Sequence, residues 1–368
     1  MNQPLVSVVM VVCNVDRFLA EAVESILGQT FREFEFIIVD FGSSDRTEAI
    51  ALSYAAKDSR IKLHKIPHCG LTEARNAGCA LAMGRYMAIM DADDVSLPNR
   101  LLWQVEFAEK HPEVGLLGGA TERIAANGRL LCVHEFKTES PEIKSALLTG
   151  CEFCQSTVLI RRQAFAFVGG YRAVFVQAED YDLWLRIAEH FQVANLKQAV
   201  VKYRLHSGQI SMRKRREQTL CILAAQASAL ARRNGCPDPL IGVEQITPAV
   251  LAGLGVTEAR QQNDVVAECR YWIGVMTMAG EYSVALNAAL EMLQSDLKSV
   301  ERWQIAELHL VVARLYWKER GFLNSLAALA RAVVTRPFLV GRPVKRLLRR
   351  HPLVGESWNR AGESRKRG

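Results

Sequence analysis

A valine-rich run of apolar side chains at residues 5–12 (LVSVVMVV) is the feature that most restricts the possible folds. A strand that is apolar at odd and even positions alike is buried on both faces, as in a parallel sheet covered by helices. Three shorter apolar runs follow at 34–39, 61–66 and 86–90, and segments with helical spacing of apolar residues separate them. This alternation of strands and helices predicts a doubly wound α/β sheet.

The composition indicates a globular protein of more than one domain. The chain has 368 residues, of which 49% are hydrophobic and 23% are charged, and domains usually hold about 100–200 residues. No apolar run reaches the roughly 20 residues of a membrane-spanning helix, and residues 1–4 lack the basic patch of a signal peptide. The nine cysteines have no framework spacing, so we interpret them as buried thiols. We therefore expect a cytoplasmic protein.

The sequence pattern changes in the second half, where helical periodicity replaces the alternation of strands and helices. We predict an α/β domain at 1–212, a helical domain at 213–335 and a basic segment at 336–368. In the helical part, similar stretches begin at Gly280 and Gly321, each after a helix that carries Tyr and Trp. They weakly resemble tetratricopeptide helix pairs, and an irregular helical bundle is an equal alternative.

Basic residues crowd the end of a chain whose net charge is +7. In residues 336–358, arginines are mixed with apolar side chains such as Phe338, Leu339 and Trp358, as in helices that lie at a membrane surface. We predict that this segment makes peripheral contact with the inner face of a membrane, and packing against the protein's own helices is the alternative. No nucleic-acid partner is expected.

Polar side chains follow three of the predicted strands. Cys13 and Asn14 come after the first strand, Asp40 ends the second, and the acidic run Asp91-Ala92-Asp93-Asp94 follows the strand at 86–90. In open α/β sheets, ligands bind beyond the carboxyl ends of the strands. The three signals together predict a ligand site at that edge.

The acidic run predicts a metal site. Carboxylates this close together repel one another unless a cation neutralises them, and no basic residue stands beside Asp91, Asp93 and Asp94. Hard oxygen ligands suit Mg²⁺ or Mn²⁺, which commonly join protein carboxylates to substrate phosphates. The alternative is a polar turn before a helix at 97–110, which Ser96 and Pro98 would begin.

A second acidic pair, Glu179-Asp180, precedes an amphipathic helix. Acidic residues at a helix N-terminus favour the helix dipole, and this is one interpretation. The other is a general base, because attack by an acceptor hydroxyl needs a carboxylate that removes its proton.

These segments together resemble the inverting glycosyltransferases of family 2. The matching stretches cover about residues 5–212 in family order, and such a series is far more specific than any one motif. They are VSVVMVVCN (6–14), SILGQTF (25–31), IVDFGSSD (38–45), GLTEARN (70–76), MDADDVSLPNRL (90–101), VGGY (168–171), ED (179–180) and YRLHSG (203–208). The resemblance implies a GT-A fold, which is a Rossmann-like, mixed and mainly parallel sheet flanked by helices.

The resemblance also implies roles for single residues. Asp180 is the implied catalytic base, with Glu179 beside it helping to bind the acceptor. Asp93 would coordinate Mn²⁺ or Mg²⁺ on the donor diphosphate. His206 would support that metal or the diphosphate, and the alternative for this histidine is an ordinary polar residue in a turn. The implied nucleotide-sugar site consists of Val12, Cys13, Asn14, Asp40, Arg75, Asn76, Asp91 and Ala92.

The implied reaction transfers a sugar from a nucleoside diphosphate donor, expected to be a UDP-sugar, to a glycan or lipid-linked acceptor with inversion at the anomeric carbon. The implied setting is polysaccharide or glycoconjugate biosynthesis. Two departures from the family pattern affect specificity. Phe41 stands where a second carboxylate is usual, which leaves the base open, and Gln155 stands where histidine is frequent. Phe41 and the repeat-like helices also motivate an alternative, in which a weakened transferase domain and the helical half form a protein-interaction scaffold.

Overall fold

The computed structural model describes residues 3–209 and 214–337. Contacts within the chain divide it into two compact units, Met1–Arg204 with Ser228–Gln245, and Leu205–Ala227 with Ile246–Gly368. The chain passes from the first unit to the second after Arg204, close to the predicted boundary at 212. The later segment Ser228–Gln245 belongs to the first unit again. The domain roles remain predictions.

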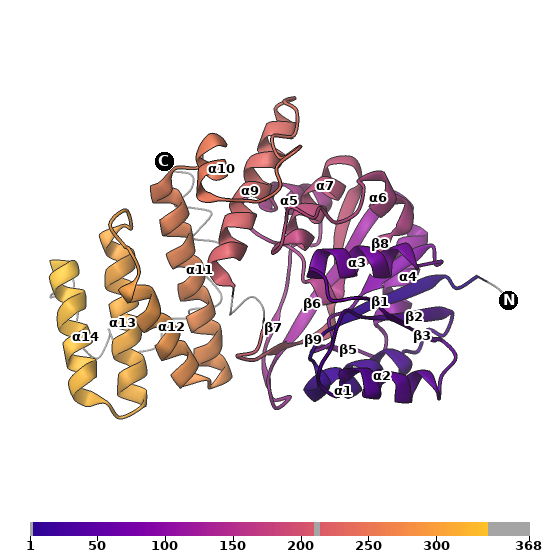
Figure 1. Ribbon diagram of the computed structural model, residues 1–368, viewed down its shortest axis with the longest axis horizontal. Coiled ribbons are helices and arrows are strands. Elements are labelled where there is room, and N and C mark those ends of the chain that lie inside the picture. The colour runs from indigo at the N-terminus through magenta and orange to yellow at the C-terminus, as the bar shows by residue number, and fades with distance from the viewer. Residues whose placement is uncertain (1–2, 210–213, 338–368) are drawn as a thin grey trace. The chain divides into compact units, whose positions relative to one another are not determined.

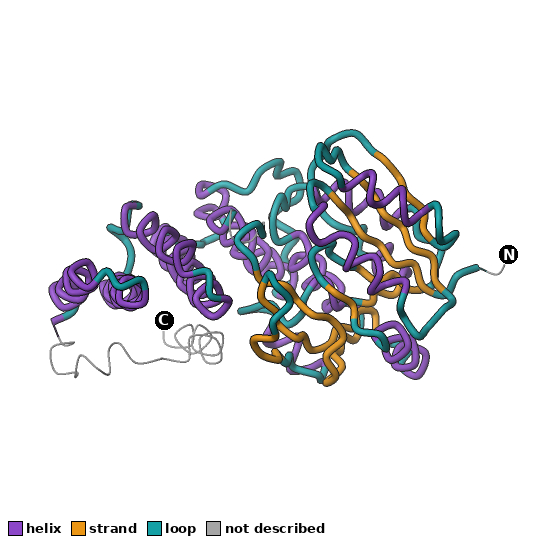
Figure 2. The backbone as a smooth tube through the Cα atoms, turned by 90° about the horizontal axis from the view of Figure 1, so that it is seen from below, coloured by secondary structure: helices purple, strands orange, loops and turns teal. Residues whose placement is uncertain are grey.

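Four parallel strands form one half of a nine-stranded sheet in the first unit, in the order β3-β2-β1-β4 (Figures 1 and 2). The strands are β1 (Val6–Val12), β2 (Phe34–Asp40), β3 (Ile61–Lys65) and β4 (Tyr86–Ile89). Val9 of β1 is in register with Ile37 on one side and with Ile89 on the other. The four strands expected from the apolar runs are therefore confirmed, to within one or two residues at their ends.

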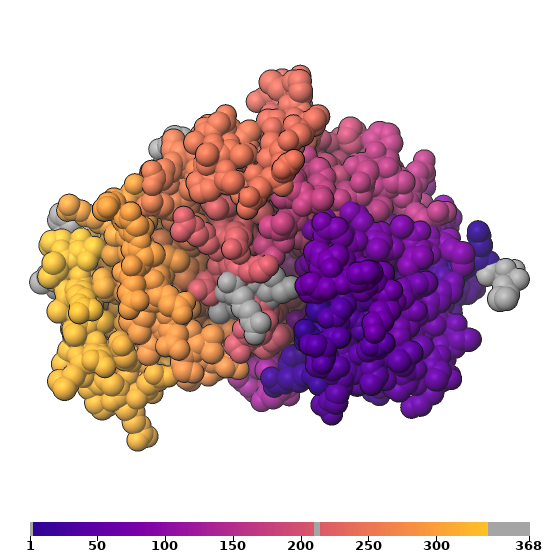
Figure 3. Space-filling view, in the orientation of Figure 1, coloured from indigo at the N-terminus to yellow at the C-terminus, as the bar shows by residue number. Residues whose placement is uncertain are grey.

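Helices cover both faces of these strands, which explains why β1 has no polar face. The helices are α1 (Asp16–Leu27), α2 (Thr47–Ala55), α3 (Leu71–Ala80) and α4 (Arg100–Lys110). Val8 and Met10 share a core with Leu19 of α1 and Leu101 of α4. On the other face α3 lies very close to β1, since a Cβ on Gly78 would come within 2.7 Å of Val9 Cγ1. In the space-filling view this N-terminal region, in indigo and purple, forms a continuous surface (Figure 3).

The other half of the sheet is antiparallel, and its order continues β4-β8-β6-β9-β5, with β7 paired to β6. These strands are β5 (Val95–Ser96), β6 (Val114–Ala125), β7 (Leu130–His134), β8 (Leu159–Arg161) and β9 (Gln192–Leu205). Short helices connect them, namely α5 (Ser140–Ala146), η1 (Gln155–Thr157), α6 (Arg162–Phe167) and α7 (Glu179–His190). The expected mixed α/β sheet is thus confirmed.

The second unit is helical, as predicted. Its helices are α10 (Pro248–Gly253), α11 (Glu258–Ala279), α12 (Tyr282–Gln294), α13 (Arg302–Lys318) and α14 (Phe322–Thr335), and α9 (Arg215–Arg233) runs from this unit into the first. Gly280, with φ of 93°, joins α11 to α12, and Arg320, with φ of 62°, precedes the turn into α14. The result is two successive helical hairpins, and the tetratricopeptide likeness remains a prediction.

Within the two described ranges, no helix is both long and apolar enough to cross a membrane. None of the nine cysteines forms a disulfide; the expected burial is found for Cys79, Cys221 and Cys269 but is wrong for the exposed Cys236. The predicted membrane-docking segment, 336–358, lies outside the described residues except for its first two positions.

Candidate active site

The loops after β1 and β2 meet through the residues that the sequence marked there. The buried Asp40 carboxylate accepts hydrogen bonds at Oδ1 from the amides of Gly42, at 3.1 Å, and Ser43, at 2.9 Å. Asn14 Oδ1 accepts a hydrogen bond from the Ser44 amide at 2.8 Å. The second carboxylate oxygen, Asp40 Oδ2, is buried and has no hydrogen-bond partner. A buried acceptor without a partner is costly, so this oxygen is suited to a donor group on a ligand.

Cys13 and Val12 complete this pocket wall. The Cys13 Sγ lies 3.9 Å from the Gly42 carbonyl oxygen, and Val12 is fully buried at the end of β1. Burial, followed by the charge of Asp40, raises the pKa of the Cys13 thiol. Cys13 therefore stays neutral near pH 7 and is not an activated nucleophile.

Phe41, the unusual residue beside Asp40, stacks against His68. Their ring centroids are 6.4 Å apart with 18° between the planes, and His68 Nδ1 lies 3.2 Å from the Phe41 carbonyl oxygen. Gly42, with φ of 100°, has the His68 Cβ 3.0 Å from where its own Cβ would stand. A role for His68 was not predicted from the sequence, because its partner Phe41 is 27 residues away and no local pattern marks this histidine.

Arg75 joins the two acidic segments that the sequence predicted separately. It lies in α3, is buried, and donates to Asp91 Oδ1 at 3.0 Å and to Glu179 Oε1. Asp91 follows β4, whereas Glu179 begins α7, so one guanidinium connects segments almost ninety residues apart. Val9, Met90 and Tyr171 line the adjoining pocket together with Arg75 and Asp91.

Negative charge is in excess around this arginine. Burial raises the pKa of Asp91, and Asp93 and Asp180 add to the rise while Arg75 opposes it. Burial likewise raises the pKa of Glu179 to about 7, against Arg75 and with Asp180 adding to the rise. These carboxylates outnumber the one guanidinium, and a divalent cation would offset the difference.

The loop of the acidic run is held by Ser156 and Arg204. The Ser156 hydroxyl donates to Asp94 Oδ2 and accepts a hydrogen bond from the Asp91 amide at 3.2 Å. The Arg204 amide donates to Asp94 Oδ1 at 2.8 Å, and its Nε donates to the Asp93 carbonyl oxygen at 2.8 Å. Asp94 is therefore an anchor of the loop. The hydrogen bonds from Ser156 and Arg204 to the acidic run were not predicted from the sequence, although Arg204 lies inside the motif at 203–208.

The donor atoms of this loop fit a hard divalent cation, because they are carboxylate oxygens. Across residues 3–209 and 214–337, no three His, Cys, Asp or Glu side chains form a ready-made metal cage. A metal held by Asp93 would therefore take further oxygen ligands from a substrate or from water, as Mg²⁺ commonly does. His206 follows β9, and its Nδ1 accepts a hydrogen bond from the Gly208 amide at 3.2 Å. Its metal role remains a prediction.

Two other predicted nucleotide contacts have structural partners here. The Asn76 side chain donates to the Tyr171 carbonyl oxygen at 2.8 Å and accepts from the Tyr171 amide at 3.0 Å. Ala92 packs into the main hydrophobic core, so a contact with a nucleotide would come from its backbone. The nucleotide roles of both residues remain predictions.

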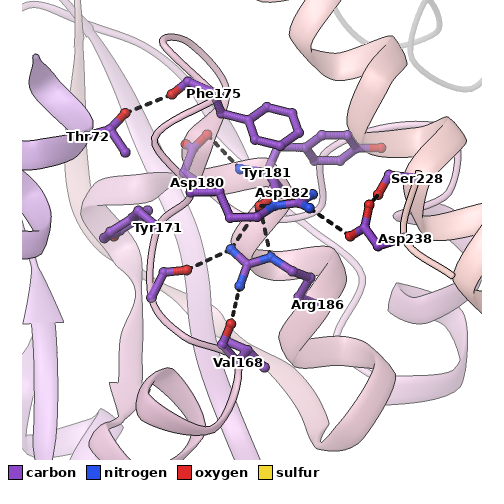
Figure 4. Close-up of polar contacts among 12 residues, drawn as sticks. Thr72, Val168, Tyr171, Phe175, Asp180, Tyr181, Asp182, Arg186, Ser228 and Asp238 are labelled. Atoms are coloured by element: carbon purple, nitrogen blue, oxygen red, sulfur yellow. Dashed lines mark hydrogen bonds and ion pairs between the residues drawn. The ribbon is translucent and has the colours of Figure 1, made fainter. Parts of the chain in front are cut away.

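Asp180 stands at the start of α7 and is half-buried. Ala178 precedes the helix in a left-handed conformation, with φ of 56°, and Asp180 Oδ1 accepts a hydrogen bond from the Tyr181 amide at 2.7 Å (Figure 4). Tyr181 in turn donates its hydroxyl proton to the Leu147 carbonyl oxygen. The turn at Ala178 and the hydrogen bonds of Tyr181 thus hold the start of α7 before and after Asp180.

A buried ion network supports the same helix end and was not predicted. Asp182 is fully buried and pairs with Arg172 and with Arg186, whose Nε lies 2.9 Å from Asp182 Oδ2 (Figure 4). Arg186 also donates to the carbonyl oxygens of Val168, at 2.6 Å, and Gly170, at 2.7 Å. Arg172 reaches on to Asp238 at 2.7 Å. The network connects α7 with the Gly169-Gly170 turn, where both glycines have positive φ.

The mixed sheet, the Asp-x-Asp loop after β4 and the second acidic pair at α7 define the chain as a glycosyltransferase of the GT-A class. Comparisons with known proteins identify the family: the model of glycosyl transferase family 2 matches residues 7–168. Relatives at 30% identity or more match it over more than two thirds of their length. The chain belongs to glycosyl transferase family 2.

Three of these relatives are bacterial. EpsE of Bacillus subtilis (strain 168) is 37% identical over 212 residues, which cover 55% of this chain and 73% of the relative. The Escherichia coli protein WfgD, a UDP-Glc:alpha-D-GlcNAc-diphosphoundecaprenol beta-1,3-glucosyltransferase, is 30% identical over 220 residues, with 59% and 83% covered. The Escherichia coli O-antigen biosynthesis glycosyltransferase WbnJ is 30% identical over 207 residues, with 55% and 80% covered.

Among solved structures, the crystal structure of S. aureus TarS 1-349 in complex with UDP-GlcNAc is similar to this chain. The TM-score is 0.52 at 17% sequence identity, and the match covers 92% of each chain. At this identity the likeness supports the GT-A fold alone.

Proposed function

We propose that this enzyme transfers a sugar from a UDP-sugar to a lipid-linked or glycan acceptor, with a divalent metal and inversion of the anomeric carbon. The observation that carries the proposal is the Arg75 bridge, which brings the Asp-x-Asp loop and the Glu179-Asp180 pair into one partly buried cluster. The relatives WfgD and WbnJ, whose names place them in glycan synthesis, support a role in polysaccharide or glycoconjugate biosynthesis.

The pocket after β1 and β2 would bind the nucleoside. Asp40 Oδ2 is a buried acceptor without a partner there, and the imide N–H of uracil can donate to it, which is compatible with UDP. Asn14 and Cys13 shape the loop around this carboxylate. Phe41, stacked on His68, adds an aromatic wall.

The diphosphate would lie at the end of β4. Asp93 would hold Mn²⁺ or Mg²⁺ there, and the metal when bound neutralises the charge that develops on the leaving diphosphate. Arg75 contributes a fixed positive charge beside Asp91. Glu179 and Asp91 fix the orientation of this guanidinium, so little reorganisation is needed as the sugar departs.

Asp180 would act as the general base. It lies at the N-terminus of α7 next to Glu179, which is already engaged by Arg75, and it is half-buried and therefore reachable. A carboxylate in this place can accept the proton of an acceptor hydroxyl as that oxygen attacks the anomeric carbon from the face opposite the diphosphate. One displacement inverts the configuration, and no covalent enzyme intermediate is required.

A lipid-linked acceptor would bring the enzyme to a membrane. WfgD is named for an acceptor on diphosphoundecaprenol, and this supports the same acceptor class here. Peripheral contact at the inner face of the membrane through the basic segment at 336–368 belongs to the proposal, as does cytoplasmic localisation.

Metal dependence gives the first test of this function. Asp93→Ala is expected to weaken binding of a UDP-sugar in the presence of Mn²⁺ by at least about tenfold, because one direct metal ligand is lost. EDTA should weaken donor binding to the wild type to the same level and leave the variant unchanged, as measured by calorimetric titration. Asp296→Ala, an exposed aspartate of the helical unit, is the control and should bind like the wild type. If EDTA changes neither the affinity for the donor nor the rate of sugar transfer, the proposed metal-dependent mechanism is contradicted.

The raised pKa of Glu179 predicts a pH dependence of donor binding. Because that pKa is about 7, Glu179 is neutral at lower pH and negatively charged at higher pH. A complex of Mn²⁺ and a UDP-sugar should therefore bind at least about threefold more tightly above pH 7 than below it, since the added charge attracts the cation.

Titrations about one pH unit on either side of that value measure the effect. Glu179→Gln should bind the donor equally at both values. A variant that keeps the full pH dependence would assign it to another group.

A further inference from the structure

Among the residues that the structure describes, no side chain neutralises the buried guanidinium of Arg123. It lies near the end of β6 and is 7% exposed, and its Nε and Nη1 are buried without a hydrogen-bond partner. By contrast, the buried Arg161 of β8 donates to the carbonyl oxygens of Val114 and Ala108. Taking a charge out of water without a partner is among the most costly arrangements in a protein. Such a group is therefore a candidate for binding an anion.

The neighbours of Arg123 are neutral near pH 7. Burial raises the pKa of the Cys154 thiol well above its usual value, and burial together with the charge of Arg123 lowers the pKa of His134 to about 4. Neither side chain can neutralise the guanidinium. Throughout the part of the chain that the structure describes, no carboxylate forms an ion pair with Arg123.

The sheet register puts Arg123 beside the active site. Strand β8 lies between β4 and β6, and Leu159 is paired with Ala88 of β4 and with Leu117 of β6. β6 is antiparallel to β8, and β8 is antiparallel to β4, so Arg123, six positions after Leu117, lies towards the same edge of the sheet as the end of β4. Neighbouring strands are about 4.8 Å apart, so the backbone of Arg123 is about two strand spacings from the line of β4. Besides burial, the charges of Asp94 and Asp91 raise the pKa of the Cys154 thiol and the charge of Arg123 lowers it, so all three charged groups lie within electrostatic range of this thiol.

Arg123 is on the opposite side of Asp91 from the nucleotide pocket. The sheet order runs β2-β1-β4-β8-β6, so Asp40 at the end of β2 and Arg123 at the end of β6 flank the end of β4. A donor held at Asp40 with its diphosphate at Asp91 leaves the region over β8 and β6 to the acceptor. An anion bound at Arg123 would then belong to the acceptor.

We propose that Arg123 binds a phosphate ester of the acceptor and thereby selects phosphate-linked acceptors. This inference rests on the proposed function. The unpaired Nε and Nη1 donate from different edges of the planar guanidinium, so a phosphate or diphosphate, with oxygens in several directions, fits them better than a single carboxylate does. Arg123 is then a residue that determines acceptor specificity, and its site is separate from the donor site.

Binding of geranyl phosphate to the full chain, loaded with UDP and Mg²⁺, tests the proposal. Because UDP and Mg²⁺ occupy the donor site, geranyl phosphate can bind only outside that site. Arg123→Met keeps the length of the side chain and is expected to weaken binding by at least about tenfold, the usual effect of losing hydrogen bonds between charged groups. Geraniol, which lacks the phosphate, should bind the two proteins equally. Inorganic phosphate and glucuronate show whether a free phosphate or an acidic sugar is preferred, and preference for glucuronate would overturn the phosphate assignment.

Thermal stability separates ligand binding from a structural role. Arg123→Met removes an unneutralised buried charge, so its melting temperature without ligand should equal or exceed that of the wild type. Arg161→Met, the matched control, removes an arginine whose hydrogen bonds are made and should melt at a lower temperature. If Arg123→Met melts as low as the control and binds geranyl phosphate like the wild type, Arg123 is structural and the inference is wrong. UDP binding by the wild type is measured separately, and its absence would instead contradict the proposed function.

Discussion

Replacing Asp180 with asparagine is expected to lower kcat for sugar transfer by about 10²–10⁴-fold, the usual contribution of a general base. Asparagine has the same size and can still accept a hydrogen bond from the Tyr181 amide, so the start of α7 should be preserved. The change removes the basic carboxylate alone. Affinity for the UDP-sugar should change by less than about twofold, because the residue acts only as the acceptor hydroxyl attacks.

The measurement is UDP release from a UDP-sugar with a lipid-linked acceptor of the proposed class, together with calorimetric titration of the donor. Glu189→Gln is the control, since Glu189 lies near the other end of α7 and pairs with Arg232 instead of Arg75. It should keep the wild-type kcat. An Asp180→Asn enzyme that transfers at the wild-type rate would exclude this residue as the base, and one that also loses donor binding would assign it to the donor site.

The parallel half of the sheet could be predicted because each strand carries its own signal. A strand such as β1 is covered by α1 on one face and by α3 on the other, so burial on both faces appears as a continuous apolar run. The antiparallel strands have weaker signals. β9 has buried, intermediate and exposed positions in short runs without a regular alternation, and β5 has two residues, so their pairing depends on partners far away in the sequence.

The candidate site shows the same division between local and long-range information. Asp91, Asp93, Glu179 and Asp180 stand in short motifs that the chemistry of carboxylates makes visible. The bridge made by Arg75 is a tertiary contact, and so are the bonds from Ser156 and Arg204 to Asp94. No local pattern encodes such contacts. The family resemblance implied a nucleotide-binding role for Arg75, and that role remains a prediction.

The arginine pair around Asp182 is a further long-range contact, since it connects α7 to a segment that the predicted boundary at 212 placed in another domain. Asp238 lies in Ser228–Gln245, which contacts assign to the first unit. It accepts hydrogen bonds from Arg172 and Arg232, each at 2.7 Å. Burial acts to raise the pKa of Asp238, but hydrogen bonds from the Leu240 amide and the Ser228 hydroxyl, followed by the charges of the two arginines, lower it to about 2. Residues beyond the matched family region thus help to position α7.

Replacing Asp182 with asparagine is therefore expected to lower the free energy of unfolding by about 3 kcal/mol or more, the range for breaking a buried ion pair from one side. The reason is that Arg172 and Arg186 lose their shared charge partner inside the protein, while Asp182 itself is fully buried. Urea denaturation followed by circular dichroism measures the change, with the midpoint and slope compared between proteins. Because Arg186 also holds the Gly169-Gly170 turn, kcat should fall as well.

Asp58→Asn is the matched control for this effect. Asp58 makes an ion pair with Arg60 at 2.7 Å, but both side chains are partly exposed, and such surface pairs contribute at most about 1 kcal/mol. The expected contrast between the two Asp→Asn changes follows from burial, because water can solvate Arg60 after the change but cannot reach Arg186 as easily. Equal unfolding free energies for the two variants would mean that the arginines around Asp182 find new partners, and the network would then not be what holds α7 in place.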